Sequence, residues 1–210
     1  MSSAEYRSAA VSDSLDASGF RVGALRPTVR PQTDQTRLQG SARTVQMVPA
    51  GADSDEPYDD AIAFIDSLAE GEVVVIATEG NDISAVWGEL FTAAAKGRQA
   101  AGLVTDGCVR DIAGVRTLGW PVFATGTRPV DYRARQRIAG VDVPIVCAGV
   151  PVSPGDLVVA DEDGIVVVPL EQLETTIELV RKRQSTESVV LEELLAGASL
   201  RRVWETYRVL

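Results

Sequence analysis

The chain contains no histidine among its 210 residues. This absence excludes Ser-His-Asp and Cys-His nucleophilic catalysis, histidine general bases, and every zinc site built on imidazole. Any catalysis must therefore use carboxylates, arginine, lysine, hydroxyl groups, backbone amides or a hard metal ion held by oxygen atoms.

Cysteine is scarce as well. The two cysteines, Cys108 and Cys147, each lie within an apolar run, and no Cys-x-x-Cys spacing exists. We expect both to be small buried hydrophobic residues in a reducing compartment.

Long apolar runs and a secretory leader are also missing. The longest apolar run, around residues 143–152, is about half of the roughly 20 residues that a membrane helix needs. Residues 1–5 lack the basic and then apolar pattern of a signal peptide. These features predict a cytoplasmic protein without a membrane partner.

Positive charge is in deficit, with 20 Lys and Arg against 30 Asp and Glu, which gives a formal net charge of −10. Such a balance argues against a nucleic-acid partner for the surface as a whole. One segment is locally basic, through Arg128, Arg133, Arg135 and Arg137. A solvated loop or strand is the simpler interpretation of this segment, and a local basic patch is the alternative.

The composition, 45% apolar and 24% charged, is typical of one globular domain of ordinary size. Between residues 61 and 124, helical periodicity alternates with continuous apolar runs, which predicts an α/β fold. The expected helices cover residues 7–19, 58–70, about 89–97 and 112–118, and the expected strands cover residues 42–48, 73–77, 102–105 and 121–124.

The last third of the chain has a different pattern. Two apolar runs, residues 157–160 and 165–168, flank Asp161-Glu162-Asp163-Gly164, which predicts a β-hairpin. Residues 170–210 have helical spacing and many charges. We therefore expect a core over about residues 11–169 and a helical C-terminal extension over residues 170–210 that contributes to assembly.

Two short stretches are candidates for a site. Gly88-Glu89-Leu90-Phe91 stands at an expected helix start, where unpaired backbone N–H groups and the helix dipole favour a carboxylate or phosphate. Most such pairs of glycine and glutamate simply begin helices, so this signal alone is weak.

Arg110-Asp111 follows the expected strand at residues 102–105 and a glycine-containing turn. In one interpretation, Asp111 is the N-cap of the next helix and Arg110 is solvated. In the other, Arg110 binds a substrate carboxylate or enolate oxygen, and Asp111 holds a divalent ion such as Mg²⁺ with water as the remaining ligands.

The spacing of these stretches resembles the class II pyruvate aldolases typified by 4-hydroxy-4-methyl-2-oxoglutarate (HMG/CHA) aldolase. The family's mark is an acidic residue, twenty residues and then Arg-Asp, and this chain has Glu89, residues 90–109 and Arg110-Asp111. The resemblance covers about residues 11–169. Further segments that resemble the family are Trp87-Gly88-Glu89-Leu90, residues 105–111, residues 119–123 and residues 154–161.

The resemblance implies roles for individual residues. Gly88, Glu89, Leu90 and Phe91 would form the substrate loop, Arg110 would bind pyruvate, and Asp111 would be the ligand of Mg²⁺ or Mn²⁺. The catalytic residues would be Glu89, Arg110 and Asp111, with Glu89 acting through water, or a water held by the metal, as the proton acceptor. The family often has aspartate at the position of Glu89.

The resemblance also implies a fold and an activity. The fold would be a single compact α/β domain with a layered β/β/α core, assembled as a homotrimer or hexamer. The activity would be retro-aldol cleavage of a 4-hydroxy-2-oxo acid to pyruvate, with oxaloacetate decarboxylation through the same enolate. Relatives include the regulator of ribonuclease activity A, so a non-catalytic protein that binds a ribonuclease is the alternative. Asp111, which the resemblance implies is missing from that branch, favours an enzyme.

Overall fold

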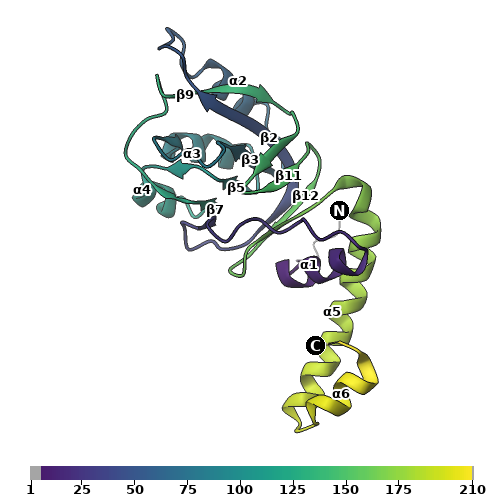
Figure 1. Cartoon of the computed structure of the whole chain (residues 1–210). Helices are drawn as coiled ribbons and strands as arrows, with labels where there is room; N and C mark the ends of the chain where they lie inside the picture. The colour runs from purple at the N-terminus through teal and green to yellow at the C-terminus, as the bar shows by residue number, and fades with distance from the viewer. Residues whose placement is uncertain (1–5, 210) are drawn as a thin grey trace.

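The computed structural model describes residues 6–209 (Figure 1). Residues 1–5, on which the expectation about a secretory leader rested, lie outside the described residues, as does Leu210. Within the described chain, no helix combines the length and the apolar character that crossing a membrane requires.

A mixed eight-stranded sheet forms the centre of the fold. Its strands β2, β3, β5 and β7 are parallel to one another, and β1, β9, β12 and β13 are antiparallel to their neighbours. The long strand β2 pairs with β3 along one edge, and with β12 and then β9 along the other. In the order β1-β7-β5-β3-β2-β12-β13, with β9 also on β2, the bounds are Arg30–Pro31, Val122–Ala124, Gly102–Thr105, Glu72–Ala77, Leu38–Pro49, Leu157–Ala160, Ile165–Val168 and Gln136–Val141.

Both faces of this sheet are buried, as the continuous apolar run in β3 predicts. Val73 and Val75 face one apolar cluster, which includes the hairpin formed by β10 (Ile145–Cys147) and β11 (Val150–Val152). Val74 and Ile76 face a second cluster with helices α2 (Asp59–Asp66), α3 (Glu89–Gly97) and α4 (Ile112–Thr117). The expected β/β/α layering is confirmed by this arrangement.

A second, three-stranded parallel sheet lies beside the main one and consists of β4 (Ala85–Trp87), β6 (Cys108–Val109) and β8 (Gly126–Thr127). Each of these short strands follows a parallel strand of the main sheet, namely β3, β5 and β7. After β3, β5 and β7 the chain leaves the main sheet and, a few residues later, forms a strand of the second sheet. The carboxyl ends of β4, β6 and β8 therefore lie close together.

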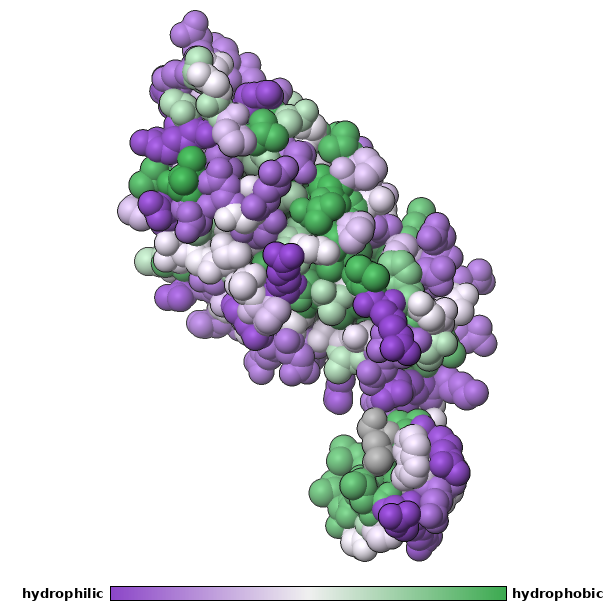
Figure 2. Space-filling view, in the orientation of Figure 1, coloured by the Kyte–Doolittle hydropathy of each residue, from purple (hydrophilic) through white to green (hydrophobic). Residues whose placement is uncertain are grey.

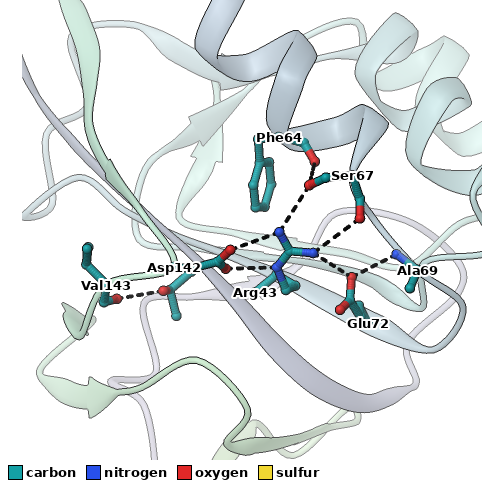
Figure 3. A network of polar contacts seen from close by, with 8 residues as sticks. Arg43, Phe64, Ser67, Ala69, Glu72, Asp142 and Val143 are labelled. Carbon is teal, nitrogen blue, oxygen red and sulfur yellow. Dashed lines mark hydrogen bonds and ion pairs between the residues drawn. The ribbon is translucent and has the colours of Figure 1, made fainter.

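One ion-pair network holds α2 against the sheet (Figure 3). The Arg43 guanidinium on β2 donates two hydrogen bonds to Asp142, at 2.8 and 2.9 Å, and one to Glu72 on β3 at 3.0 Å. It also donates to Ser67 Oγ at the end of α2 and lies over the ring of Phe64, with its Cζ 5.4 Å from the centroid. The hydrogen bonds to Asp142, and the charge of Glu72, raise the pKa of Arg43 despite its partial burial.

The C-terminal segment forms an arm that extends away from the sheet (Figure 1). Helix α5 (Leu173–Leu195) packs beside α1 (Ser8–Ala17), and the Arg183 guanidinium lies 2.6 Å from the Asp13 carboxylate. After a break at Gly197, which has a φ of +93°, helix α6 (Leu200–Tyr207) folds back on α5.

Most of the expected elements are confirmed, including the helices near residues 7–19, 58–70 and 89–97, the buried strands and the hairpin of β12 with β13. Both cysteines are free and buried, as expected. The short strands β4, β6 and β8 and the break within the C-terminal extension were not expected, because two or three residues carry no recognisable period.

We expect Arg43→Ala to lower the free energy of unfolding by about 1–3 kcal/mol, because it leaves the partly buried Glu72 and the more exposed Asp142 without their cation. The matched control is Arg98→Ala, which removes an ion pair with Asp66 whose side chains are 49% and 63% exposed. That change is expected to cost less than about 1 kcal/mol. Urea unfolding measures both values, and equal losses would contradict the structural role of the network.

We propose that the arm contributes to assembly of a homotrimer or hexamer. Its distal end exposes Leu191, Leu195, Leu200 and Trp204, and Figure 2 shows apolar surface gathered on this end. We expect the double change Leu195→Glu and Trp204→Glu to lower the mass measured by light scattering, because buried carboxylates would destabilise a contact between copies. Arg201→Glu, at a highly exposed charged position of the same helix, is the control. A monomeric parent protein would contradict the proposal.

Candidate active site

A cavity of about 270 Å³ lies where β4, β6 and β8 end. Gly88 directly follows β4, Arg110 and Asp111 directly follow β6, and Asp131 lies four residues after β8. The position of Asp131 is fixed by a bridge to Ala85 at the start of β4. Ligand sites of α/β folds commonly lie at the carboxyl ends of parallel strands, and this cavity has that position.

Gly88 and Asp111 are in close contact. A Cβ added to Gly88 would lie 2.7 Å from Asp111 Oδ2 and 3.1 Å from Arg110 Cγ. The backbone of Gly88 has ordinary extended angles, so glycine is needed here for space and not for conformation. The Arg110 backbone N–H donates to the Trp87 carbonyl at 2.9 Å, which aligns the two segments.

Aromatic packing supports the start of α3. The Trp87 indole stacks on Trp120 with a centroid distance of 6.1 Å and meets Phe91 edge-on at 5.5 Å. Its Nε1–H donates to Thr92 Oγ1, and that hydroxyl donates to the Gly88 carbonyl. These buried bonds hold Gly88 and the first turn of α3 in a single arrangement.

Arg110 is held by carboxylates on two sides. Its NH1 lies 2.8 Å from Asp131 Oδ2, and its Nε lies 3.4 Å from Asp111 Oδ2. Asp131 Oδ2 also accepts the Tyr58 hydroxyl at 2.9 Å, and Tyr58 meets Tyr132 edge-on at 5.6 Å. Asp131 therefore joins the arginine to the N-terminal end of α2.

Asp131 is ionised at neutral pH. Burial alone raises the pKa of its carboxyl, but hydrogen bonds from the Arg133 N–H and the Tyr58 hydroxyl outweigh burial, together with the charge of Arg110. The net result is a pKa below the ordinary value for aspartate. Burial, the main cause, raises the pKa of Tyr58 and of Tyr132, so both stay protonated.

The structure brings together most of the residues that the sequence motif singled out. Gly88, Leu90, Phe91, Arg110 and Asp111 all line the cavity. Asp111 stands at the N-cap position of α4, but with a φ of +55° its side chain makes no capping hydrogen bond, so the capping interpretation is wrong for the side chain.

Glu89 is placed differently from its neighbours. Its exposed carboxylate lies over Gly114 of α4, where an added Cβ would be 2.2 Å from Glu89 Cδ. Glu89 is not among the residues that line the cavity. It therefore lies beside the site, between the starts of α3 and α4.

The donor set at Asp111 fits a hard divalent ion with few protein ligands. The Asp111 side chain is 49% exposed at the cavity, and its Oδ2 lies 3.4 Å from Arg110 Nε. Residues 6–209 contain no cluster of three or more acidic or cysteine side chains that could enclose a metal. A single carboxylate, with water and substrate as further ligands, is the coordination that Mg²⁺ commonly accepts.

Asp131 and Tyr58 were not predicted as site residues. Asp131 lies within the arginine-rich segment for which a solvated loop or strand is the simpler interpretation. Arg133 in this segment is exposed and pairs with Asp53, whereas Asp131 pairs with Arg110 in the cavity. The one sequence feature that pointed to Asp131 is its position as a carboxylate between Arg128 and Arg133.

The curled mixed sheet and the cavity define an α/β protein with a charged candidate site at the ends of short parallel strands. A family model described as "RraA-like: Aldolase/RraA" matches residues 8–167. The chain belongs to this family, as the motifs indicated.

Two curated relatives show how far the similarity extends. A Halalkalibacterium halodurans protein named "Putative 4-hydroxy-4-methyl-2-oxoglutarate aldolase" is 33% identical over 84% of this chain and 79% of its own length. Protein DlpA of Legionella pneumophila is 30% identical over 95% of this chain, and this chain spans about a third of DlpA, 32% of its length.

Two solved structures share the fold. An uncharacterized protein from Pseudomonas syringae pv. tomato has a TM-score of 0.82 and 31% identity, covering 94% of this chain and 92% of its own. Streptomyces coelicolor RraAS2, described as an unusual member of the RNase ES inhibitor RraA protein family, has a TM-score of 0.76 and 31% identity, covering 91% of each chain.

Asp131→Asn tests the ion pair with Arg110 through its pH dependence. Because the folded-state pKa of Asp131 is depressed, its ionised form stabilises the folded protein above the unfolded pKa, about 3.9. This contribution is lost as the pH falls through the folded-state pKa. We expect wild type to exceed the variant in unfolding free energy at pH 7 and this difference to shrink toward pH 3 in urea titrations.

The control for this experiment is Asp66→Asn, whose exposed carboxylate pairs with Arg98. A stability difference between wild type and Asp131→Asn that stays constant from pH 7 to pH 3 would contradict the ionised state of Asp131.

Proposed function

We propose that the chain is a divalent-metal-dependent class II aldolase that cleaves 4-hydroxy-2-oxo acids, such as 4-hydroxy-4-methyl-2-oxoglutarate, to pyruvate. The observation that carries this proposal is that Arg110 and Asp111 line one cavity, and that the backbone of Gly88 packs closely against both side chains. The aldolase name of the Halalkalibacterium halodurans relative supports it.

The proposed reaction breaks the bond between C3 and C4 of the substrate. The electron pair of that bond stays with C3 and forms the enolate of pyruvate, while C4 becomes a carbonyl carbon as its hydroxyl loses a proton. The enolate then takes up a proton at C3. Negative charge therefore develops on the 2-oxo oxygen, and stabilising that charge is the main catalytic task.

Arg110 is suited to this task. A guanidinium can bind carboxylate and enolate oxygens through parallel N–H donors. The ion pair with Asp131 and the contact with Asp111 hold the guanidinium in place before substrate binds. Little reorganisation is then needed as charge develops.

Asp111 would hold Mg²⁺ or Mn²⁺ through its exposed carboxylate. When bound, such an ion polarises the 2-oxo group and the neighbouring carboxylate of the substrate. Glu89 stays the proposed acceptor of the hydroxyl proton, acting through water from its position beside the site. The same enolate arises when oxaloacetate loses CO₂, so the proposal includes oxaloacetate decarboxylation.

We expect pyruvate release from a 4-hydroxy-2-oxo acid or from oxaloacetate to require Mg²⁺ or Mn²⁺.

Arg110→Lys should lower kcat/KM by about a hundredfold, because lysine loses the forked donor geometry at the enolate. Asp111→Ala should abolish metal-dependent activity. A lactate dehydrogenase coupled assay measures these rates, and Arg98→Lys, at an exposed ion pair, is the matched control.

Full activity in EDTA or in Asp111→Ala would contradict the metal-dependent mechanism. A non-catalytic regulator is the alternative, which the similarity to Streptomyces coelicolor RraAS2 favours. That alternative predicts no pyruvate release from any 2-oxo acid and direct binding to a ribonuclease.

A further inference from the structure

The two carboxylates beside Arg110 contact its guanidinium unequally. Arg110 NH1 lies 2.8 Å from Asp131 Oδ2, the distance of a charge-assisted hydrogen bond, whereas Arg110 Nε lies 3.4 Å from Asp111 Oδ2. The side chain of Asp131 is 24% exposed and that of Asp111 is 49% exposed, so water and salt screen the pair with Asp131 less. The guanidinium is therefore held mainly by Asp131.

Asp131 is itself fixed at both carboxylate oxygens. Its Oδ1 accepts the Arg133 backbone N–H at 2.9 Å, and its Oδ2 accepts the Tyr58 hydroxyl at 2.9 Å. Its backbone also forms a bridge with Ala85 at the start of β4. A carboxylate with these partners has a set position, so it determines where the Arg110 guanidinium lies.

Arg110 is also a competitor for the Asp111 carboxylate. A cation that pairs closely with a carboxylate repels a divalent ion from the same oxygen atoms. Without the charge of Asp131, the Arg110 guanidinium would be free to close on Asp111 and neutralise it. With Asp131 in place, the Asp111 side chain keeps its carboxylate exposed at the cavity.

We propose that Asp131 is a positioning residue for the metal site: by holding the Arg110 guanidinium, it leaves the Asp111 carboxylate available to a divalent ion. The inference rests on the proposed function, because it takes Asp111 as the ligand of that ion. Asp131 acts through Arg110 in this role. One carboxylate then binds the ion, and the other holds the neighbouring cation away from it.

Mn²⁺ alone is the probe, and the electron paramagnetic resonance signal of the free ion measures its dissociation constant without turnover. Asp131→Asn keeps the shape of the side chain and removes its charge, so Arg110 should pair with Asp111 and compete with Mn²⁺. The expected result is Mn²⁺ affinity at least about fivefold weaker than in wild type, which is within the range of coupling between contacting residues. Asp66→Asn, which removes an exposed carboxylate paired with Arg98, is the control and should leave the affinity unchanged.

A double-mutant cycle separates this role from a direct effect of the Asp131 charge on the ion. In Arg110→Gln the competing cation is gone, so adding Asp131→Asn should change the Mn²⁺ affinity by less than about twofold. An equal loss in both backgrounds would overturn the role through Arg110, because neither a direct electrostatic effect nor a site that no longer folds requires the arginine.

Tyr58→Phe separates the charge of Asp131 from the packing of α2. It removes one hydrogen bond to Asp131 Oδ2 and keeps the ion pair with Arg110, so the Mn²⁺ affinity should stay within about twofold of wild type. A loss as large as in Asp131→Asn would assign the effect to α2 and overturn the proposal.

The outcomes separate this inference from the proposed function. Wild-type Mn²⁺ affinity in Asp131→Asn would overturn the positioning role while the aldolase function stands. Equal Mn²⁺ binding to wild type and Asp111→Ala would instead contradict the metal site on which the proposed function rests.

Discussion

The candidate site depends on the pairing of three very short parallel strands. β4, β6 and β8 contain three, two and two residues, and their backbone hydrogen bonds align the chain where it leaves β3, β5 and β7. Gly88, Arg110 and Asp131 are separated by more than forty residues from first to last, and this pairing brings them to one edge. Strands this short are not stable alone, so their geometry relies on the apolar cluster that packs against α2, α3 and α4.

The same cluster links the site to the rest of the domain. Trp87 packs on Trp120 beneath the site, while α2 is held at one end by Arg43 through Ser67 and at the other by Tyr58 through Asp131. Because both ends of α2 are fixed, Tyr58 and Ile62, which line the cavity on this side, have a defined position relative to Arg110. A rigid support of this kind is what preorganised charge stabilisation requires.

Much of the fold could be predicted from the sequence, because buried parallel strands such as residues 73–77 are continuous apolar runs and the helices have clear periods. The motif residues of the site were predicted by spacing, and the cavity contains all of them except Glu89. The rest was beyond sequence reasoning for physical reasons. Asp131 reaches Arg110 through the bridge to Ala85 and the pairing of β6 with β8, and the direction of the Glu89 carboxylate depends on the space left by Gly114.

The proposed function depends on Arg110 and Asp111 forming a binding site for the enolate of a 2-oxo acid. Oxalate is a stable mimic of that enolate, and isothermal titration calorimetry measures its binding without turnover. We expect oxalate to bind the wild-type protein in Mg²⁺, to bind much more weakly in EDTA, and to show no detectable binding to Arg110→Ala. Equal oxalate affinity in wild type, Arg110→Ala and Asp111→Ala would contradict a binding site formed by these two residues.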